Sequence, residues 1–324
     1  MLSEINFQFP EVFSFLHSFL SDEKDFKVHT SGSTGIPKLI SIPKKYMRAS
    51  ARKTIKALDL KKGNKALLCL PTDKIGGIMM LVRWVEGELD LYPEGKSGNP
   101  LLDTTTVYDF GAMVPYQVRQ SINELALVKK LIIGGAPVNP SLENDLKNLP
   151  NEIYHTYGMT ETISHVALRR VNGTEEANSF KALPDVRFNV DDRSCLVINA
   201  PEIGVENLVT NDVVNLINET EFTWKGRFDN VVNSGGIKLL PEEIEKKIGD
   251  IGIPYFLFGE SDSKLGERLV MMIESSNPIS LEGVASFVSG LSKYEIPKAV
   301  YSVSKFVEAA GGKLNRKATI ELFR

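Results

Sequence analysis

Short apolar runs alternate with segments of helical periodicity through the first two thirds of the chain, and this alternation constrains the fold most strongly. The runs at 66–70, 130–133 and 195–198 are bounded by Gly, Pro or Asp, as buried strands commonly are. Between them, apolar residues recur at helical spacing over 44–58 and 75–85. Strands that alternate with helices pack in layers, so the sequence predicts a large α/β domain of mixed sheets covered by helices.

A change of pattern marks the last part of the chain. Short strands with polar turns predict a β-rich subdomain over about 179–228. A strand at 237–240 and a helix at 241–248 follow, and this helix begins with proline and acids and ends with lysines, in agreement with the helix dipole. We therefore expect a large domain over 1–228 that includes the β-rich subdomain, and a small α+β C-terminal domain over 229–324.

Composition excludes several classes of function. The 38 Lys and Arg residues against 41 Asp and Glu give a net charge of −3, so bulk binding of nucleic acid is not expected. The longest apolar runs, such as Ile78–Val82, are far shorter than the roughly 18 residues of a membrane-spanning helix. Cys69 and Cys195 lack the spacing of a metal site or disulfide framework, and residues 10–20 predict an amphipathic helix, not a signal peptide. We expect a cytoplasmic protein whose partners are small molecules, and the sequence leaves its oligomeric state open.

A loop rich in hydroxyls and glycines lies between two extended runs, 26–29 and 39–42. Glycine backbone N–H groups, hydroxyl donors and a lysine are what a polyphosphate requires. The spacing is not that of a Walker A loop, because Leu39 stands where the magnesium-binding hydroxyl is needed. A flexible Ser/Gly hairpin loop is the alternative interpretation. The candidate phosphate ligands are Thr30, Ser31, Gly32, Ser33, Thr34, Gly35 and Lys38.

Four further segments follow this loop in order. They are Gly134-Gly135-Ala136-Pro137, Tyr157-Gly158-Met159-Thr160-Glu161, Gly226-Arg227-Phe228-Asp229 with Gly235-Gly236 and the 241–245 helix start, and Gly312-Lys313-Leu314-Asn315-Arg316. Together with the loop they resemble the signatures of the AMP-forming acyl-CoA synthetases, and the chain is identified as a member of this adenylate-forming family. An ordered set of five is far more specific than any one loop.

The resemblance implies a reaction in which a carboxylate attacks the α-phosphate of ATP, with Mg²⁺ as cofactor and CoA as the second substrate. Glu161 would hold the magnesium, Thr160 would donate to phosphate and Tyr157 would lie against adenine. Asp212 and Arg227 would bind the ribose. Without the family, these segments would be a turn and ordinary surface charges. The other residues expected around the nucleotide are Gly135, Ala136, Pro137 and Gly158.

Lys313 is the lysine that the resemblance assigns to adenylation, where it would bridge the substrate carboxylate and the α-phosphate. Thr160 and Glu161 complete the expected catalytic set. Arg316 and Lys317 lie nearby and are the residues most easily confused with Lys313. In the family, a mobile C-terminal domain swings about a hinge, here Asp229, and the loop at Gly235 and Gly236 would then admit the CoA thiol.

The short length of the chain and its segments at 75–84 and 157–167 most resemble the o-succinylbenzoate–CoA ligases of menaquinone synthesis, including compact bacterial forms, and this likeness suggests the acid. Such an acid has two carboxylates, so the one that does not react needs a cation, and we expect Lys74 or Arg83 to supply it. Arg83 on an apolar helix has a second interpretation, in which its side chain snorkels to the surface. His165 has one too, as a packed or hydrogen-bonded histidine. The expected lining of the acid site also includes Gly77, Gly134, Ser164 and His165.

The chain departs from its relatives in three ways. It begins 29 residues before Thr30, so the large N-terminal subdomain of the family is expected to be missing. Lys74 stands at a position where relatives carry histidine, and Lys238 where many carry arginine. Alternatives to o-succinylbenzoate are another aryl or fatty acid, or a carrier-protein thiol as acceptor. A nucleotide-binding relative without turnover is the alternative from another class.

Overall fold

The computed structural model describes residues 9–30, 38–95, 97–174, 177–309 and 313–323. Two compact units are found. The N-terminal unit comprises Met1–Phe188, Ile198–Leu208 and Asn218–Phe222, and the C-terminal unit comprises Asn189–Val197, Val209–Ile217 and Thr223–Arg324. Each unit is described by itself. The expected boundary at Asp229 and the hinge there stay predictions.

The helices agree closely with the periodicity of the sequence. Those expected at 10–20, 44–58, 75–85 and 241–248 are confirmed as α2, α3, α4 and α7. The α-helices in the described residues are α2 (Pro10–Leu20), α3 (Lys44–Ala57), α4 (Ile75–Gly87), α5 (Pro115–Gln120), α6 (Pro140–Leu146), α7 (Pro241–Ile248), α8 (Leu281–Val288) and α9 (Arg316–Phe323). Short 3-10 turns are η1 (Leu125–Leu127), η2 (Thr160–Thr162), η3 (Pro201–Ile203) and η4 (Phe228–Asn230). In this part of the chain no helix is long and apolar enough to cross a membrane.

The strands of the described residues form two large sheets and two short antiparallel pairs. The first half of the chain holds β1 (Asp25–Thr30), β2 (Lys38–Pro43), β3 (Lys65–Leu68), β4 (Asp90–Pro93), β5 (Tyr108–Met113), β6 (Val128–Ile133), β7 (Glu152–Gly158) and β8 (His165–Arg170). The β-rich stretch holds β9 (Phe180–Ala182), β10 (Arg187–Val190), β11 (Cys195–Ala200), β12 (Val205–Asn218) and β13 (Glu221–Arg227). The C-terminal part holds β14 (Val232–Ser234), β15 (Ile237–Leu239), β16 (Tyr255–Asp262), β17 (Gly266–Glu274), β18 (Val300–Val303), β19 (Glu308–Ala309) and β20 (Lys313–Leu314).

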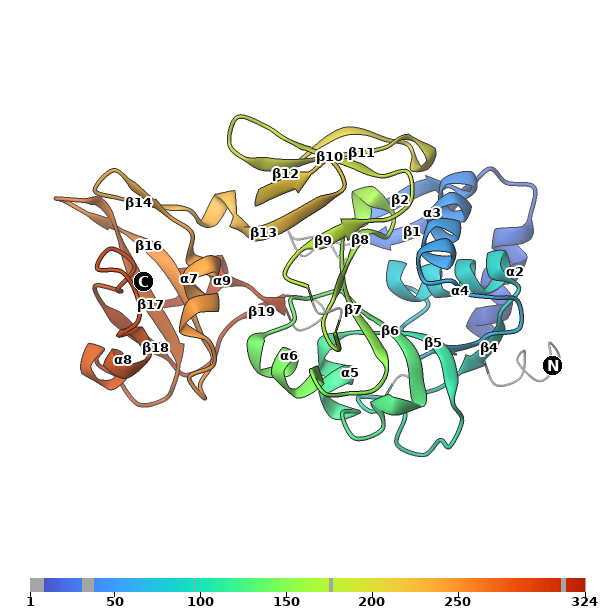
Figure 1. The fold of residues 1–324 in the computed structure, drawn as a ribbon, viewed down its shortest axis with the longest axis horizontal. Helices are drawn as coiled ribbons and strands as arrows, with labels where there is room; N and C mark the ends of the chain where they lie inside the picture. The colour runs from blue at the N-terminus through green and yellow to red at the C-terminus, as the bar shows by residue number, and fades with distance from the viewer. Residues whose placement is uncertain (1–8, 31–37, 96, 175–176, 310–312, 324) are drawn as a thin grey trace. The chain divides into compact units, whose positions relative to one another are not determined.

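The largest sheet has the order β10-β11-β12-β13-β9-β8-β7-β6-β5-β3-β4 (Figure 1). From β4 through β3, β5 and β6 to β7 the pairing is parallel, and from β7 through β8 to β9 it is antiparallel. Parallel pairs joined by helical crossovers define the α/β class. The predicted fold class of mixed sheets with helices is therefore confirmed.

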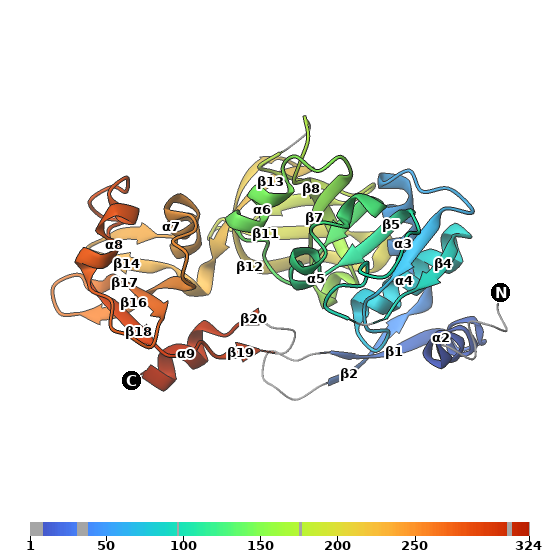
Figure 2. The same ribbon diagram turned by 90° about the horizontal axis from the view of Figure 1, so that it is seen from below.

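Helices cover both faces of the parallel strands (Figure 2). Leu131 and Ile133 of β6 join a core that includes Val118 of α5 and Leu142 of α6. Side chains alternate along a strand, so the neighbouring Lys130 belongs to the opposite face, where its Nζ donates to the carbonyl at the end of α3. The parallel strands are thus buried between α5 and α6 on one face and the α3 side on the other.

Ion pairs join helix α4 to helix α3, and close packing joins α4 to the segment that precedes it. Glu86 of α4 accepts from Arg48 and, at 2.8 Å, from Arg52, both on α3. Gly77 lies so close to the preceding segment that a Cβ there would be 2.2 Å from the carbonyl oxygen of Pro71. The glycine thus lets α4 begin directly beneath the chain that leaves β3.

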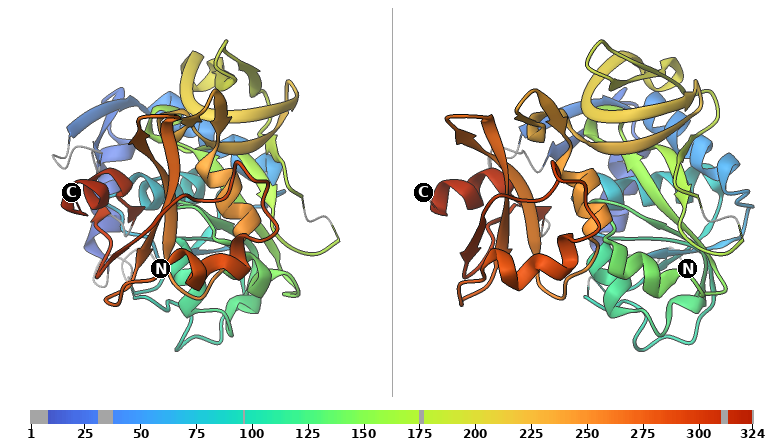
Figure 3. Two further views of the ribbon diagram at one scale, coloured as in Figure 1. Left: turned by 90° about the vertical axis from the view of Figure 1, so that its left-hand side faces the viewer. Right: turned by 60° about the vertical axis from the view of Figure 1, so that its left-hand side comes forward.

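The C-terminal unit is built on a second sheet of order β15-β14-β17-β16, with β18 parallel to β17. Figure 3 shows these strands, coloured orange to red, as one twisted layer beside its helices. Its core joins Leu257 and Met271 of the sheet to Ile244 of α7 and Val284 of α8. At the β14–β15 turn, Gly235 and Gly236 have φ of +58° and +83°, the left-handed backbone of a tight hairpin turn.

Candidate active site

Two predicted segments follow neighbouring parallel strands at their carboxyl ends. Gly134 comes directly after β6, and Thr160 follows the end of β7. The segments approach each other closely, since a Cβ on Gly134 would lie 2.6 Å from the Thr156 hydroxyl oxygen. In open α/β sheets this edge is where ligands bind, so the structure places both segments at the expected position for a small-molecule site.

The ring of Tyr157 is held by aromatic neighbours. Its centroid lies 5.0 Å from that of Phe222, edge to face, and 5.8 Å from that of Phe180. Phe180 and Phe222 stack on each other with centroids 5.5 Å apart, because β9 and β13 pair these two residues directly. Tyr157 is half-buried. Its ring therefore has a fixed support, as a residue that stacks on adenine requires.

A strained turn connects the Tyr157 segment to β8. Ile163 has φ +66° and ψ −48°, a conformation that a β-branched residue rarely adopts. The Ser164 N–H donates to the Thr162 carbonyl at 2.7 Å, which closes a three-residue turn. Such a backbone costs on the order of 1–3 kcal/mol and persists where the surroundings impose it. Here the turn brings Ser164 and His165 back alongside Gly158, which has no room for a Cβ against them.

Glu161, the predicted magnesium ligand, lies in η2 with an exposed side chain. No group of three or more His, Cys, Asp or Glu side chains that could hold a metal occurs within the described residues. Mg²⁺ bound to a nucleotide needs only one or two carboxylates, since phosphate oxygens and water supply its other ligands. A single exposed glutamate at the edge of the sheet therefore fits this ion.

Arg83, Ser164 and His165 form one cluster, in which Arg83 and His165 are buried and Ser164 is half-buried. Arg83 is only 2% exposed, and its Nη2 donates to the Ser164 hydroxyl oxygen at 2.8 Å. The same hydroxyl lies 3.4 Å from His165 Nδ1, and His165 Nε2 lies 3.1 Å from the hydroxyl oxygen of Thr54 on α3. The alternative in which Arg83 snorkels to the surface is wrong. His165 is 6% exposed and hydrogen-bonded, as its second interpretation expected.

The Arg83 guanidinium has no counter-ion within the described part of the chain. Its Nε is buried without a hydrogen-bond partner there, and burial alone lowers the pKa of Arg83 to about 9. Burial and the Arg83 charge also hold the pKa of His165 well below 6.5, so the imidazole is neutral at pH 7. A buried cation without a partner is costly, and an anionic ligand would compensate it.

The predicted ribose ligands lie together in the C-terminal unit. Asp212 is buried, and its Oδ1 accepts from Trp224 Nε1 at 3.2 Å and from Arg227 Nη1 at 3.4 Å. Arg227 Nη2 also lies 3.3 Å from Asp229 Oδ2, and Asn211 Nδ2 donates to the same carboxylate. The structure thus joins Asp212, Arg227 and the predicted hinge residue in one polar chain.

A sequence profile described as AMP-binding enzyme matches residues 26–200. The chain belongs to the AMP-binding enzyme family. An acyl-CoA synthetase (AMP-forming)/AMP-acid ligase II-like protein from Dyadobacter fermentans is 38% identical, with 97% of this chain and 94% of that chain covered and a TM-score of 0.66. A curated relative, the 2-succinylbenzoate–CoA ligase of Salmonella typhimurium, is 24% identical over 89% of this chain and 67% of its own length. The o-succinylbenzoate CoA synthetase of Bacillus subtilis, solved with the acyl-adenylate OSB-AMP, is similar in fold, with 19% identity, 91% and 69% coverage and a TM-score of 0.76.

Some residues expected from the AMP-binding enzyme signatures lie at the edges of the described chain. Ser31, Gly32, Ser33, Thr34 and Gly35 are outside the described residues, while Thr30 and Lys38 face each other as the last pair of the β1–β2 hairpin. Lys313 begins β20 and pairs with Ala309 of β19. The structure describes the backbone at Thr30, Lys38 and Lys313, and the roles expected of these residues and of the loop between Thr30 and Lys38 stay predictions.

Of the two residues that could be confused with Lys313, one is fully engaged elsewhere. Arg316 donates with both Nη atoms to Glu245, at 2.8 and 2.7 Å, and its guanidinium lies over the Phe256 ring. Lys317 is exposed beside Glu321. The Arg316 guanidinium is therefore held by the ion pair with Glu245.

Lys74 does not join the Arg83 cluster. It is the residue that precedes α4, its side chain is 53% exposed, and its Nζ lies 3.2 Å from Asp73 Oδ2. Arg83 is nine residues further along the same helix, about 13 Å by helical rise. Gly77 packs against Pro71, as described above, so its requirement for glycine is structural. Of the two candidate cations for the second carboxylate, the structure favours Arg83.

Thr54, Phe180 and Phe222 were not predicted as site residues. Thr54 falls on the apolar stripe of α3 with Met47, Ala51 and Leu58, so a polar side chain at that place was the available signal. Phe180 and Phe222 gave none, because their contact depends on which strands pair. Phe180 and Phe222 support the ring of the predicted residue Tyr157, and neither lies in a signature segment of the family.

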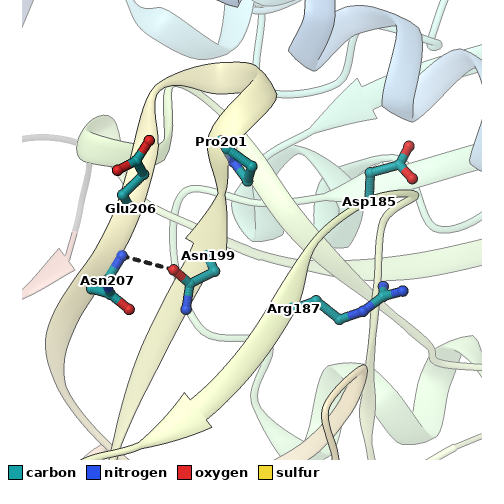
Figure 4. Close-up of a pocket in the computed structure, with 6 residues that line it drawn as sticks. All are labelled: Asp185, Arg187, Asn199, Pro201, Glu206 and Asn207. Carbon is teal, nitrogen blue, oxygen red and sulfur yellow. Dashed lines mark hydrogen bonds between the residues drawn. The ribbon is translucent and has the colours of Figure 1, made fainter.

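An open pocket of about 540 Å³ lies on the β-rich strands of the N-terminal unit (Figure 4). Asp185, Arg187, Asn199, Pro201, Glu206 and Asn207 line it. The backbone N–H of Asn207 donates to the Asn199 side chain at 2.9 Å. Since no predicted site residue lines this pocket, it is not part of the candidate active site.

Proposed function

We propose that this chain is an AMP-forming acid–CoA ligase that converts o-succinylbenzoate to o-succinylbenzoyl-CoA. A carboxylate attacks the α-phosphate of ATP, pyrophosphate leaves, and the CoA thiol then displaces AMP from the acyl-adenylate. The observation that carries the choice of acid is the buried Arg83 beside Ser164, a cation without a counter-ion among the described residues. An acid with a second carboxylate would supply that counter-ion.

Relatives support this choice. Curated proteins that match 89% of this chain, from Salmonella typhimurium and Haemophilus influenzae, are named 2-succinylbenzoate–CoA ligases. Their identities are 24% and 25%. At these sequence identities the family is established, and the identity of the acid has to be argued from the residues that would bind it. The Arg83 cluster therefore adds an argument independent of the names.

The roles proposed for the nucleotide site follow from charge and support. Tyr157 stacks on adenine, with Phe180 and Phe222 behind it. Thr160 donates to phosphate, and Mg²⁺ held by Glu161 would supply positive charge next to the phosphate oxygens. The hydroxyl, glycine and lysine groups of the loop at 30–38 donate to the remaining oxygens.

In the C-terminal unit, Asp212 accepts from the ribose hydroxyls beside Arg227. Lys313 neutralises the charge that develops between the attacking carboxylate and the α-phosphate. We propose that the C-terminal domain turns about Asp229 between the two half-reactions, and that the Gly235-Gly236 turn then borders the thiol path. A cytoplasmic location is also proposed, because ATP and CoA are substrates and Cys69 and Cys195 are free thiols.

Exchange of labelled pyrophosphate into ATP tests this function. The wild type is expected to catalyse exchange that depends on o-succinylbenzoate, while Lys313→Ala loses it and still forms thioester from supplied acyl-adenylate. A protein that only binds nucleotide shows no exchange with any acid. Exchange that depends on benzoate or a medium-chain acid instead would keep the ligase and replace its substrate.

A further inference from the structure

The hydroxyl of Ser164 lies between a donor that cannot accept and a ring nitrogen that can. Arg83 Nη2 is 2.8 Å from Ser164 Oγ, and a guanidinium only donates. Ser164 Oγ is therefore the acceptor of this bond, and its own proton is available to another partner. His165 Nδ1 lies 3.4 Å away and can accept that proton.

The direction of donation continues from His165 into helix α3. A neutral imidazole whose Nδ1 accepts carries its proton on Nε2, which lies 3.1 Å from Thr54 Oγ1. The Thr54 hydroxyl in turn donates to the Ser50 carbonyl at 3.5 Å, and Thr54 is fully buried. In this series the hydroxyl of Ser164, the ring N–H of His165 and the hydroxyl of Thr54 each have an acceptor, and the series ends on the backbone of α3.

We propose that Thr54 and His165 are positioning residues for recognition of the acid, which act by fixing the orientation of the Ser164 hydroxyl to which Arg83 donates. With the Ser164 proton turned to His165, one arm of the guanidinium is fixed and its remaining N–H groups are kept for a carboxylate. This inference rests on the proposed function, and it adds the groups that prepare Arg83 for the carboxylate that does not react.

The backbone at this point supports the same interpretation. The turn at Ile163 holds a left-handed conformation that places Ser164 and His165 side by side at the start of β8. Gly158 provides the space, because a Cβ there would be 2.4 Å from the Ser164 carbonyl oxygen. A strained turn and a glycine contact thus both serve to place the Ser164 hydroxyl, to which Arg83 donates.

Thr54→Val tests the proposal, since valine keeps the shape and removes the hydroxyl. We expect the KM for o-succinylbenzoate to rise about tenfold, with kcat and the KM for ATP changed less than twofold. Thr54→Ser is expected to restore the KM. Ser121→Ala is the matched control, because it removes another fully buried hydroxyl, one bonded to Asn99 at 2.8 Å, and should leave the KM unchanged.

A Thr54→Val enzyme with an unchanged KM for the acid overturns the proposal, as does a KM for ATP that rises in step. The ¹⁵N spectrum of labelled His165 provides a second readout that does not depend on turnover. The proposal requires the neutral Nε2–H form in the wild type at pH 7, and either the Nδ1–H form or the cation contradicts it. If the wild type makes no o-succinylbenzoyl-CoA, the proposed function fails, and the spectrum still decides the positioning chain.

Discussion

Arg316 and Glu245 form a two-armed ion pair inside the C-terminal unit, with N–O distances of 2.8 and 2.7 Å. Arg316 follows Lys313 by three residues at the start of α9, and Glu245 belongs to α7. The pair anchors the segment that carries the predicted catalytic lysine to the helix that packs on the sheet. Burial raises the pKa of Glu245 and the Arg316 charge opposes that shift, so the pair depends on both partners.

Removal of one partner is expected to destabilise the protein strongly. Arg316→Met leaves Glu245 buried without its cation, and the free energy of unfolding of the C-terminal unit should fall by about 3–5 kcal/mol. Adding Glu245→Leu should recover most of this loss, because the unpaired charge is then gone. Urea denaturation of the single and double variants measures both. A single variant as stable as the wild type would show that the ion pair has no structural role.

Arg83 and Lys74 are expected to differ sharply in their effect on acid binding. Arg83→Ala should raise the KM for o-succinylbenzoate on the order of a hundredfold, since a charged hydrogen-bonded contact is lost. Lys74→Ala should change it less than twofold, because Lys74 is exposed and pairs with Asp73. Steady-state kinetics with ATP held saturating make the comparison. If Arg83→Ala leaves the KM unchanged, the assignment of this cluster to the acid is wrong.

Two adjacent glycines of α4 provide a matched pair for stability. Gly77→Ala places a Cβ 2.2 Å from the Pro71 carbonyl oxygen, so α4 must shift and the melting temperature should fall by several degrees. Gly76→Ala meets only the end of the Leu70 side chain, at 3.3 Å, and alanine favours helix. Its melting temperature should equal or exceed that of the wild type. Equal loss in both variants would refute the close-contact explanation.

Acid is expected to destabilise the protein partly through His155. Burial first, and then the charge of Arg169, lower the pKa of His155 from 6.5 to about 3. Between those two values the unfolded chain binds a proton that the folded chain does not, so the free energy of unfolding rises with pH, by at most about 1.4 kcal/mol per pH unit for one group. The contribution of His155 to the free energy of unfolding is fully present above pH 6.5, and it is lost progressively as the pH falls from 6.5 to about 3. His155→Gln should therefore show a flatter stability profile between pH 6.5 and 4, measured by denaturant titration, and an unchanged slope would contradict this.

The sequence predicted the features that depend on local pattern. The helices at α2, α3 and α4 follow from their apolar spacing, and the signature segments fall where strands end at the sheet edge. The buried position of Arg83 did not follow from the sequence, because an arginine on an apolar helix has two outcomes that differ only in what packs around it.

Contacts between distant strands and helices were also beyond sequence reasoning. Thr54 and His165 are 111 residues apart, and their hydrogen bond depends on how α3 lies against β8. Phe180 meets Phe222 only because β9 pairs with β13 in that register. The turn at Ile163 contains no Gly or Asn, the residues that would have predicted a positive φ there. Each depends on tertiary packing that overrides local preference.

Formation of CoA esters from a panel of acids tests the central claim most directly. Purified protein is supplied with ATP, Mg²⁺ and CoA together with o-succinylbenzoate, benzoate or medium-chain acids, and the products are identified by mass spectrometry. The account predicts o-succinylbenzoyl-CoA, with AMP and pyrophosphate released in equal amounts and the highest kcat/KM for that acid. A higher kcat/KM for an acid with a single carboxylate, or no CoA ester from any acid in the panel, would contradict it.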